Sequence, residues 1–293
     1  AEFGCKITIL EYLPSILATE EKMIVKMVKR RLEKHGIEIH ESKNVISIEP
    51  TDDGIIATTC SAKIPRNEIA NADKQTFTAE KCLVSIGRKK ISDGLNLEKF
   101  NIRTDRGAVL INQKTMETDC PGIYAIGDCT GIIMLAHYAS YQGDVAISHS
   151  LDTIGGFDIK FEPAEHKVVP ATIFTHPNIG SVGLTRKEAK KKYGKVLVGR
   201  FSYQSSGKAL CMGADEGVMI VIVDKKTDKV VGASCYGEGA PELISEMSVA
   251  IQNGLTTHEI ANTIHSHPTI SEIALEATED AHGMAIHKAG RRK

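Results

Sequence analysis

The segment HSHPTISEIALEA, residues 265–277, combines an imidazole and a carboxylate at a spacing that can support proton transfer. Pro268 fixes the bond that follows His267, and a helix is predicted to begin near Glu272. A carboxylate five residues after a histidine, just past a helix start, can reach back to one ring nitrogen. The other nitrogen then stays free to exchange protons with a substrate, so His267 and Glu272 are candidate catalytic residues.

Two other interpretations of this segment remain open. Thr269 and Glu272 also fit a T-x-x-E capping box, in which the glutamate would only cap the helix. His265 and His267 alternate as they would on a strand and could share a metal ion. However, no cysteine or third histidine clusters with them, and we therefore predict no metal site.

The first 130 residues read as alternating strands and helices. A strand over 6–10 ends at Glu11, and a helix over 20–36, with apolar residues at helical spacing, stops at Gly36. Further strands are predicted at 37–42, 44–50, 54–60, 82–87 and 123–127. The runs CLVSIG (82–87) and IYAIG (123–127) have the length of buried strands. This order is typical of part of a dinucleotide-binding unit, so the fold class is α/β.

After residue 130 the predicted order of helices and strands changes. A helix over 136–150 is followed by a looser stretch and then by a helix over 184–194, with a capping box of Thr185 and Glu188. Antiparallel strands are predicted at 196–203 and within the hairpin 217–237, and helices at 241–254, 257–265 and 271–281. Strands followed by helices on one side indicate an α+β layer domain.

Several of these segments, in this order, resemble the pyridine nucleotide-disulfide oxidoreductase family. The HxHPTxSE pattern resembles the family's C-terminal motif, particularly in the members that oxidise dihydrolipoamide. Residues 118–143 are similar to its second flavin fingerprint, residues 169–185 to the start of its interface domain, and CLVSIGRKK to its IGR motif. The resemblance implies a partial NAD-binding domain over 1–117, the end of an FAD-binding domain over 118–165 and an interface domain over 166–293.

The family also implies roles for individual residues. His267 would be the catalytic acid/base and Glu272 the carboxylate that orients it. Glu11 would bind the adenosine ribose of NAD and repel the 2′-phosphate of NADP, and Asp128 would bind the flavin near its ribityl-phosphate region. The remaining positions implied to contact a cofactor are Val45, Gly87, Arg88, Met134, Leu135, Ala136 and His137.

The implied function is oxidation of dihydrolipoamide to lipoamide, with electrons passing through a redox disulfide and FAD to NAD. The implied assembly is a homodimer that serves the lipoyl groups of 2-oxo acid dehydrogenase-type complexes. The chain nevertheless contains no G-x-G-x-x-G and no C-x-x-x-x-C sequence. We therefore expect an N-terminally truncated, inactive fragment that does not retain FAD. Its seven scattered cysteines are expected to be buried, reduced thiols of a cytoplasmic protein.

Composition narrows the remaining alternatives. A formal net charge of −1 gives no global attraction to nucleic acid, and no apolar run has the length of a membrane span. A glutathione reductase-like relative is disfavoured because no arginine follows Glu11, and a mercuric reductase-like one because the C-terminal KAGRRK has no cysteine pair. A non-catalytic dimerisation module and a zinc-binding protein stay open, to be separated by flavin and zinc content.

Overall fold

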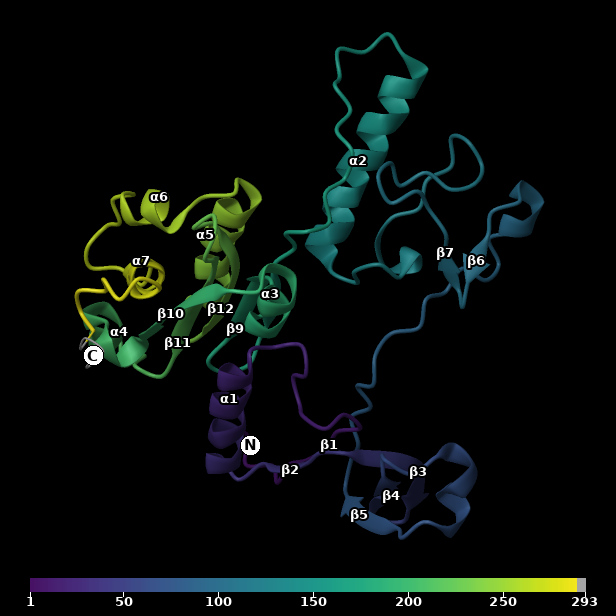
Figure 1. Cartoon of the computed structure of the whole chain (residues 1–293). Helices are drawn as coiled ribbons and strands as arrows, with labels where there is room; N and C mark the ends of the chain where they lie inside the picture. The colour runs from purple at the N-terminus through teal and green to yellow at the C-terminus, as the bar shows by residue number, and fades with distance from the viewer. Residues whose placement is uncertain (289–293) are drawn as a thin grey trace. The chain divides into compact units, whose positions relative to one another are not determined.

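The computed structural model describes residues 1–288, which form two compact units (Figure 1). One unit combines Ala1–Ser85 with the segment from Thr172 onward, and the other is Ile86–Ala171. No described helix is long and apolar enough to cross a membrane.

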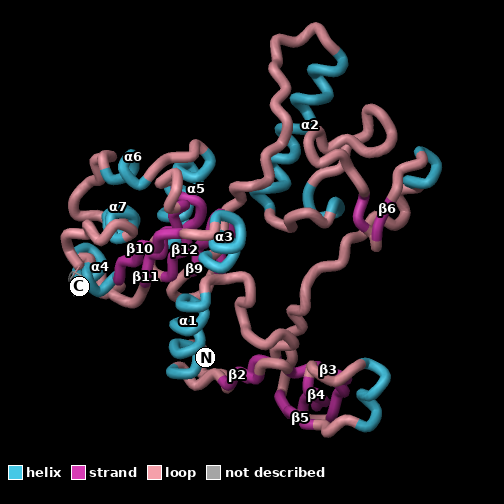
Figure 2. Tube along the Cα trace, in the orientation of Figure 1, coloured by secondary structure: helices cyan, strands magenta, loops and turns pink. Residues whose placement is uncertain are grey.

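The centre of the first unit is a five-stranded sheet of order β10-β11-β12-β9-β8 (Figure 2). Its strands are β8 (Ala171–Ile173), β9 (Ile179–Gly183), β10 (Val196–Ser202), β11 (Val218–Asp224) and β12 (Val230–Tyr236). The β10–β11, β11–β12 and β12–β9 pairs are antiparallel. All seven residues of β11 are buried, as expected for an apolar central strand that is covered on both faces.

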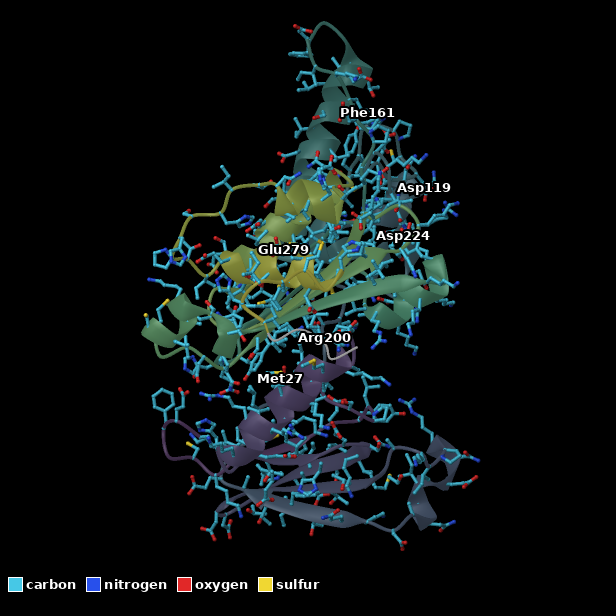
Figure 3. All side chains as sticks on the ribbon, turned by 60° about the vertical axis from the view of Figure 1, so that its left-hand side comes forward. Met27, Asp119, Phe161, Arg200, Asp224 and Glu279 are labelled. Atoms are coloured by element: carbon cyan, nitrogen blue, oxygen red, sulfur yellow. The ribbon has the colours of Figure 1, made fainter. Side chains whose placement is uncertain are left out.

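Helices cover both faces of this sheet. The helices of this unit are α1 (Lys22–Lys34), α3 (Arg186–Tyr193), α4 (Gly207–Cys211), α5 (Ala240–Gln252), α6 (Thr257–Ala261) and α7 (Glu272–Asp280), and a short 3-10 turn, η4, spans Tyr203–Ser205. Ile24 and Val28 of α1 and Ala189 of α3 share a core with alternate residues of β11. Figure 3 shows α7, with Glu279, on the opposite side of the sheet from α1, with Met27.

The N-terminal residues of the same unit form a strand–helix–strand motif and a meander. β1 (Thr8–Leu10) and β2 (Glu38–His40) are parallel and are joined through α1, as in a Rossmann-like unit. β3 (Lys43–Thr51), β4 (Gly54–Ser61) and β5 (Gln75–Ala79) form a three-stranded antiparallel sheet, with η1 (Arg66–Asn71) before β5. These elements confirm the predicted α/β class.

The second unit is built around α2 (Ala136–Ile154). Its small core contains Met116, Val145, Ala146 and Ala164. The other elements are the hairpin of β6 (Thr104–Asp105) and β7 (Ala108–Val109), with η2 (Leu97–Phe100) and η3 (Gly127–Thr130).

Two predicted strands are wrong. Residues 82–87 are exposed and irregular, with Leu83 91% and Ile86 93% exposed. Residues 123–127 form only an isolated bridge through Tyr124 before η3 begins. A strand needs a neighbour for its backbone groups, and no described strand lies beside either segment. Apolar composition alone was therefore not enough to predict a strand at either segment.

The contact between α7 and β10 requires a glycine. A Cβ on Gly199 would lie 1.8 Å from the carbonyl oxygen of Ala277 and 2.7 Å from the amide nitrogen of Ala281. Backbone atoms cannot yield as a flexible side chain can, so a side chain at this position would push α7 away from the sheet.

We predict that Gly199→Ala lowers the free energy of unfolding by about 1–3 kcal/mol, the usual cost of overpacking. Gly207→Ala is the matched control, because a Cβ there meets no atom within 4 Å. It should change stability by no more than about 0.5 kcal/mol. Urea unfolding of both variants checks the prediction, and equal stability of the two would contradict it.

Candidate active site

His267 and Glu272 form a hydrogen-bonded pair at the start of α7. The Nδ1 atom of His267 lies 2.8 Å from Oε1 of Glu272. A carboxylate can only accept, so Nδ1 carries the proton. The His267 side chain is 81% exposed, whereas that of Glu272 is 27% exposed. Nε2 of His267 has no partner among residues 1–288, so the pair presents one free ring nitrogen to solvent.

The second carboxylate oxygen of Glu272 fixes the loop before α7. Oε2 accepts a hydrogen bond from the backbone N–H of Thr269 at 2.8 Å, as in one half of a capping box. The other half of the box is not formed among the described residues, because the N-cap of α7 is Ser271 and no side chain caps the helix there. The Thr269 hydroxyl donates instead to the carbonyl of Ser266 at 2.7 Å. Glu272 therefore both caps the loop and holds the imidazole, so the two interpretations of the sequence are compatible.

The electrostatic state of Glu272 follows from these contacts. Partial burial raises the pKa of its carboxyl group, but the hydrogen bonds from the Thr269 N–H and from His267 lower it. The nearby imidazoles of His267 and His287 act in the same direction, and the net pKa lies below the ordinary value. The ionised carboxylate is thus the form that the fold stabilises.

His265 has a different environment from His267. Its side chain is 7% exposed, and Nε2 lies 2.9 Å from Oε1 of Glu246 on α5. Nδ1 faces the carbonyl oxygen of Thr263 at 2.8 Å. Both ring nitrogens are therefore engaged, and no group of three potential metal ligands occurs among the described residues. Glu246 was not predicted as a partner of His265, because it lies 19 residues away on another helix.

In the second unit, two of the predicted cofactor residues contact each other. Nε of Arg88 lies 2.9 Å from Oδ2 of Asp128, in an ion pair that the sequence did not indicate. Asp128 lies in η3, directly after Gly127, whose φ of 72° is left-handed. The buried Gln142 of α2 accepts the Gly127 N–H at 2.7 Å, so this helix fixes the turn that carries Asp128.

The start of α2 contains the four other predicted flavin residues. Leu135 is the N-cap and makes no side-chain cap hydrogen bond, and Ala136 begins the helix. Met134 is partly exposed. Nε2 of His137 donates to the carbonyl of Pro170 at 2.8 Å, so its ring is tied to the end of this unit.

The remaining predicted residues make few contacts. Glu11 directly follows β1, and its Oε1 accepts the N–H of Leu13 at 2.7 Å. Val45 is partly exposed beside a bulge in β3. Gly87, in the second unit, has a φ of 115°, and a Cβ there would meet no atom within 4 Å. This positive φ favours glycine at position 87.

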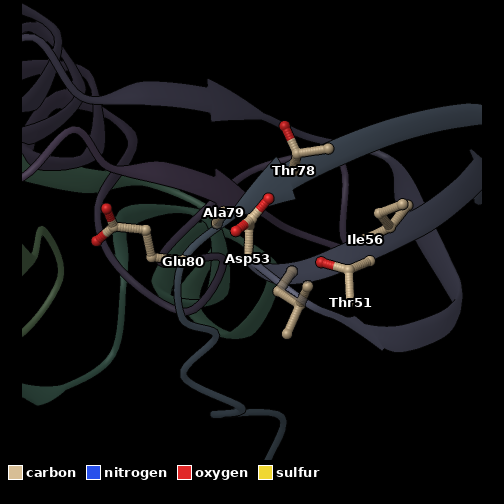
Figure 4. Close-up of a pocket in the computed structure, with 7 residues that line it drawn as sticks. Thr51, Asp53, Ile56, Thr78, Ala79 and Glu80 are labelled. Carbon is tan, nitrogen blue, oxygen red and sulfur yellow. The ribbon is translucent and has the colours of Figure 1, made fainter.

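A separate open groove of about 400 Å³ lies at one end of the three-stranded sheet (Figure 4). Its lining residues are Thr51, Asp53, Ile55, Ile56, Thr78, Ala79 and Glu80. None of them was predicted to bind a ligand, and the groove has no imidazole or thiol.

The cysteines are free, but only two of them are buried. Cys60 and Cys235 are buried, whereas Cys5, Cys82 and Cys211 are exposed, so the prediction of uniformly buried thiols is wrong. Burial raises the pKa of Cys235 to about 12, despite an opposing hydrogen bond with Tyr203. That thiol therefore stays protonated and unreactive at neutral pH.

Family models match most of the chain. Residues 1–143 match the model described as pyridine nucleotide-disulphide oxidoreductase, and residues 169–278 match the dimerisation domain of the same family. Both matches agree with the order of motifs along the sequence.

Curated relatives with the name dihydrolipoyl dehydrogenase align with nearly the whole chain. The protein from Halobacterium salinarum is 36% identical over 99% of this chain and 58% of its own length. One from Bacillus subtilis is 38% identical over 98% of this chain and also 58% of its own length. The chain thus spans less than two thirds of these relatives.

Solved structures support the fold. LpdA from Mycobacterium tuberculosis superposes with a TM-score of 0.83, at 24% identity, over 95% of this chain and 57% of that one. The HOCl-induced flavoprotein disulfide reductase RclA from Escherichia coli, in its Cu(II) complex, gives a TM-score of 0.81 at 23% identity, over 94% of this chain and 59% of that one.

We predict that Glu272 contributes to stability only where it is ionised. Its folded-state pKa is lowered from 4.5, so its contribution is present above pH 4.5 and is lost as the pH falls through the folded-state value. Glu272→Gln should therefore be less stable than the unmodified chain at pH 7, and this difference should shrink in acid. Urea unfolding across this range tests the prediction, and a difference independent of pH would contradict it.

Proposed function

Because the chain belongs to the pyridine nucleotide-disulphide oxidoreductase family, we propose that it forms part of an enzyme that oxidises dihydrolipoamide to lipoamide with NAD as acceptor. Support comes from the relatives named dihydrolipoyl dehydrogenase, which align over nearly all of these residues. The observation that carries the proposal is the His267–Glu272 pair, because it provides the acid/base group that dithiol oxidation needs.

His267 would act as the proton acceptor. A thiol attacks a disulfide as its thiolate, so a base must first remove the proton. Nδ1 of His267 is held by Glu272, which leaves Nε2 directed to solvent and able to take a proton from a dithiol. The negative charge of Glu272 stabilises the imidazolium that results. In the reverse direction the imidazolium returns the proton to the thiolate.

We assign FAD to the second unit and to residues beyond these 293. When bound, FAD would provide the redox centre between the disulfide and the nicotinamide. The partly exposed carboxylate of Asp128 fits the role of a hydroxyl acceptor, and Arg88 and the Gly127 turn hold it in place. Met134, Leu135, Ala136 and His137 would lie against the ring system. The sequence contains neither the glycine loops nor the C-x-x-x-x-C pair, so we propose that residues 1–293 alone neither retain FAD nor complete the reaction.

We assign NAD binding to residues 1–117, with Glu11, Val45, Gly87 and Arg88 near the cofactor. Glu11 lies at the carboxyl end of a parallel strand, which is where α/β sheets bind nucleotides. The Leu13 N–H holds one of its oxygens, so the carboxylate has a fixed position from which it can accept ribose hydroxyls.

We assign residues 166–293 to a homodimer interface, with the end of the FAD-binding domain over 118–165. His267 is exposed and has no redox cysteine beside it in the sequence, so it would serve a disulfide of the partner subunit. The substrates of such a dimer would be lipoyl groups of 2-oxo acid dehydrogenase-type complexes, and the enzyme would act in the cytoplasm.

In the complete enzyme, His267→Gln should lower dihydrolipoamide-dependent NAD reduction by ~10²–10⁴-fold, as expected for the loss of one general acid/base. Glu272→Gln should cost less, because the imidazole remains. His258→Gln is the matched control, since His258 is an exposed histidine that lies away from the His267–Glu272 pair in sequence and whose ring is hydrogen-bonded to Asn262. Steady-state rates, flavin absorbance and oligomeric state are measured together. Full activity of the His267 variant, or of a stable monomer, would refute the proposed role.

The complete enzyme should also prefer NAD over NADP by about tenfold or more, because one screened charge repulsion of ~1–3 kcal/mol opposes the extra phosphate. Glu11→Gln should reduce this preference, whereas Glu33→Gln, which removes an exposed carboxylate on α1, should not. The ratio of kcat/KM for the two cofactors is the measurement. Equal efficiency of the unmodified enzyme with both would disprove the assignment of Glu11.

A further inference from the structure

We propose that the outer faces of α1 and α3 form one docking surface for an acidic segment of a partner protein. Ten exposed cationic side chains lie on or directly beside these helices, and none forms a salt bridge with a described residue. These residues, here termed the basic face, are Lys22, Lys26, Arg30, Lys34, Arg186, Lys187, Lys190, Lys191, Lys192 and Lys195.

The two helices belong to one surface. Ile24 and Val28 of α1 and Ala189 of α3 are buried in the same core, against the same side of the five-stranded sheet. The N-termini of the helices also meet, because the carboxylate of Glu21 accepts the backbone N–H of Arg186. The apolar sides of both helices thus face the sheet, and their charged sides face solvent together.

Two other cations of α1, Lys29 and Arg31, form salt bridges within the unit. Lys29 pairs with Glu41 at 2.7 Å. Arg31 pairs with Glu216 and donates to the carbonyl of His176, which ties α1 to the C-terminal segment of the unit. The basic face has no such partners. Within the helices only Glu33 and Glu188 are acidic, and Glu188 is held by Thr185 in a capping box.

The concentration of positive charge is large for this chain. The formal net charge is −1, so the rest of the chain carries −11 once the ten cations are set aside. Ten like charges on two helices repel one another, and the repulsion is relieved only by counter-ions or by an oppositely charged surface. This cost gives the basic face a preference for an anionic partner.

The composition of the basic face suits an anionic protein segment better than a nucleic acid. Eight of its ten residues are lysines, which act as hydrated point charges and attract carboxylates without a fixed bidentate geometry. Tyr193 is the aromatic residue of α3, and the Lys192 ammonium lies 5.0 Å from its ring centroid, so this ring is not free for a base.

The dimensions of the basic face favour a compact partner. At 1.5 Å per residue, α1 is about 20 Å long and α3 about 12 Å, which matches a short acidic segment.

The test uses the 293-residue chain and a fluorescein-labelled oligo-glutamate peptide, with binding followed by fluorescence anisotropy at low salt. One variant changes Lys187, Lys190 and Lys191 to Gln, and a second changes Lys22, Lys26 and Lys34 to Gln. Each should weaken binding by about fivefold to tenfold, since each exposed charge pair contributes modestly. Raising salt to about 0.5 M should abolish binding, because the Debye length falls to a few ångströms.

The matched control changes Lys63, Lys74 and Lys81 to Gln, which removes three exposed lysines from the segments around β4 and β5. It should bind the peptide like the unmodified chain, and circular dichroism should show all variants folded. Unchanged affinity of both basic-face variants would overturn the proposal. Tighter binding to a DNA duplex, or to phosphatidylserine vesicles, that the same variants abolish would replace the acidic protein with that ligand and also overturn it.

Discussion

The close contact of α7 with β10 is the constraint on which the candidate site depends. Gly199 lets the helix backbone approach the strand, and Ile273, Ala274 and Ala277 of the same helix are fully buried. Because α7 begins at Glu272, fixing the helix also fixes the carboxylate. The carboxylate then holds both the Thr269 amide and the His267 ring, so the position of an exposed imidazole depends on the apolar packing of α7 against the sheet.

Charge has two distinct uses in the same unit. Glu41 and Glu216 form salt bridges with cations of α1 and so stabilise the packing of this helix against the rest of the unit. The cations of the basic face form no salt bridge with a described residue, and we propose that they serve recognition instead. Packing thus fixes the helices, and their outer faces remain exposed to solvent.

The sequence predicted the elements whose signals are local. The helix of α1, the β11–β12 hairpin and the capping box of α3 all follow from periodicity or from residues a few positions apart. The His267–Glu272 pair was predicted for the same reason, since five residues separate its members.

Features that depend on distant neighbours were not predictable. Residues 82–87 and 123–127 have strand composition, but strand formation depends on a partner that no described segment provides. The Glu246–His265 and Arg88–Asp128 pairs join residues 19 and 40 positions apart, and neither spacing carries a local signal.

The most direct test of the central claim is the tautomer of His267. It can be read from the imidazole ¹⁵N shifts in a long-range ¹H–¹⁵N NMR spectrum, recorded at a pH where the ring is neutral. A proton on Nδ1 and a bare Nε2 are expected, because the Glu272 carboxylate can only accept. Glu272→Gln should weaken this preference. A neutral ring with its proton on Nε2 would contradict the claim that Glu272 orients His267 as a base.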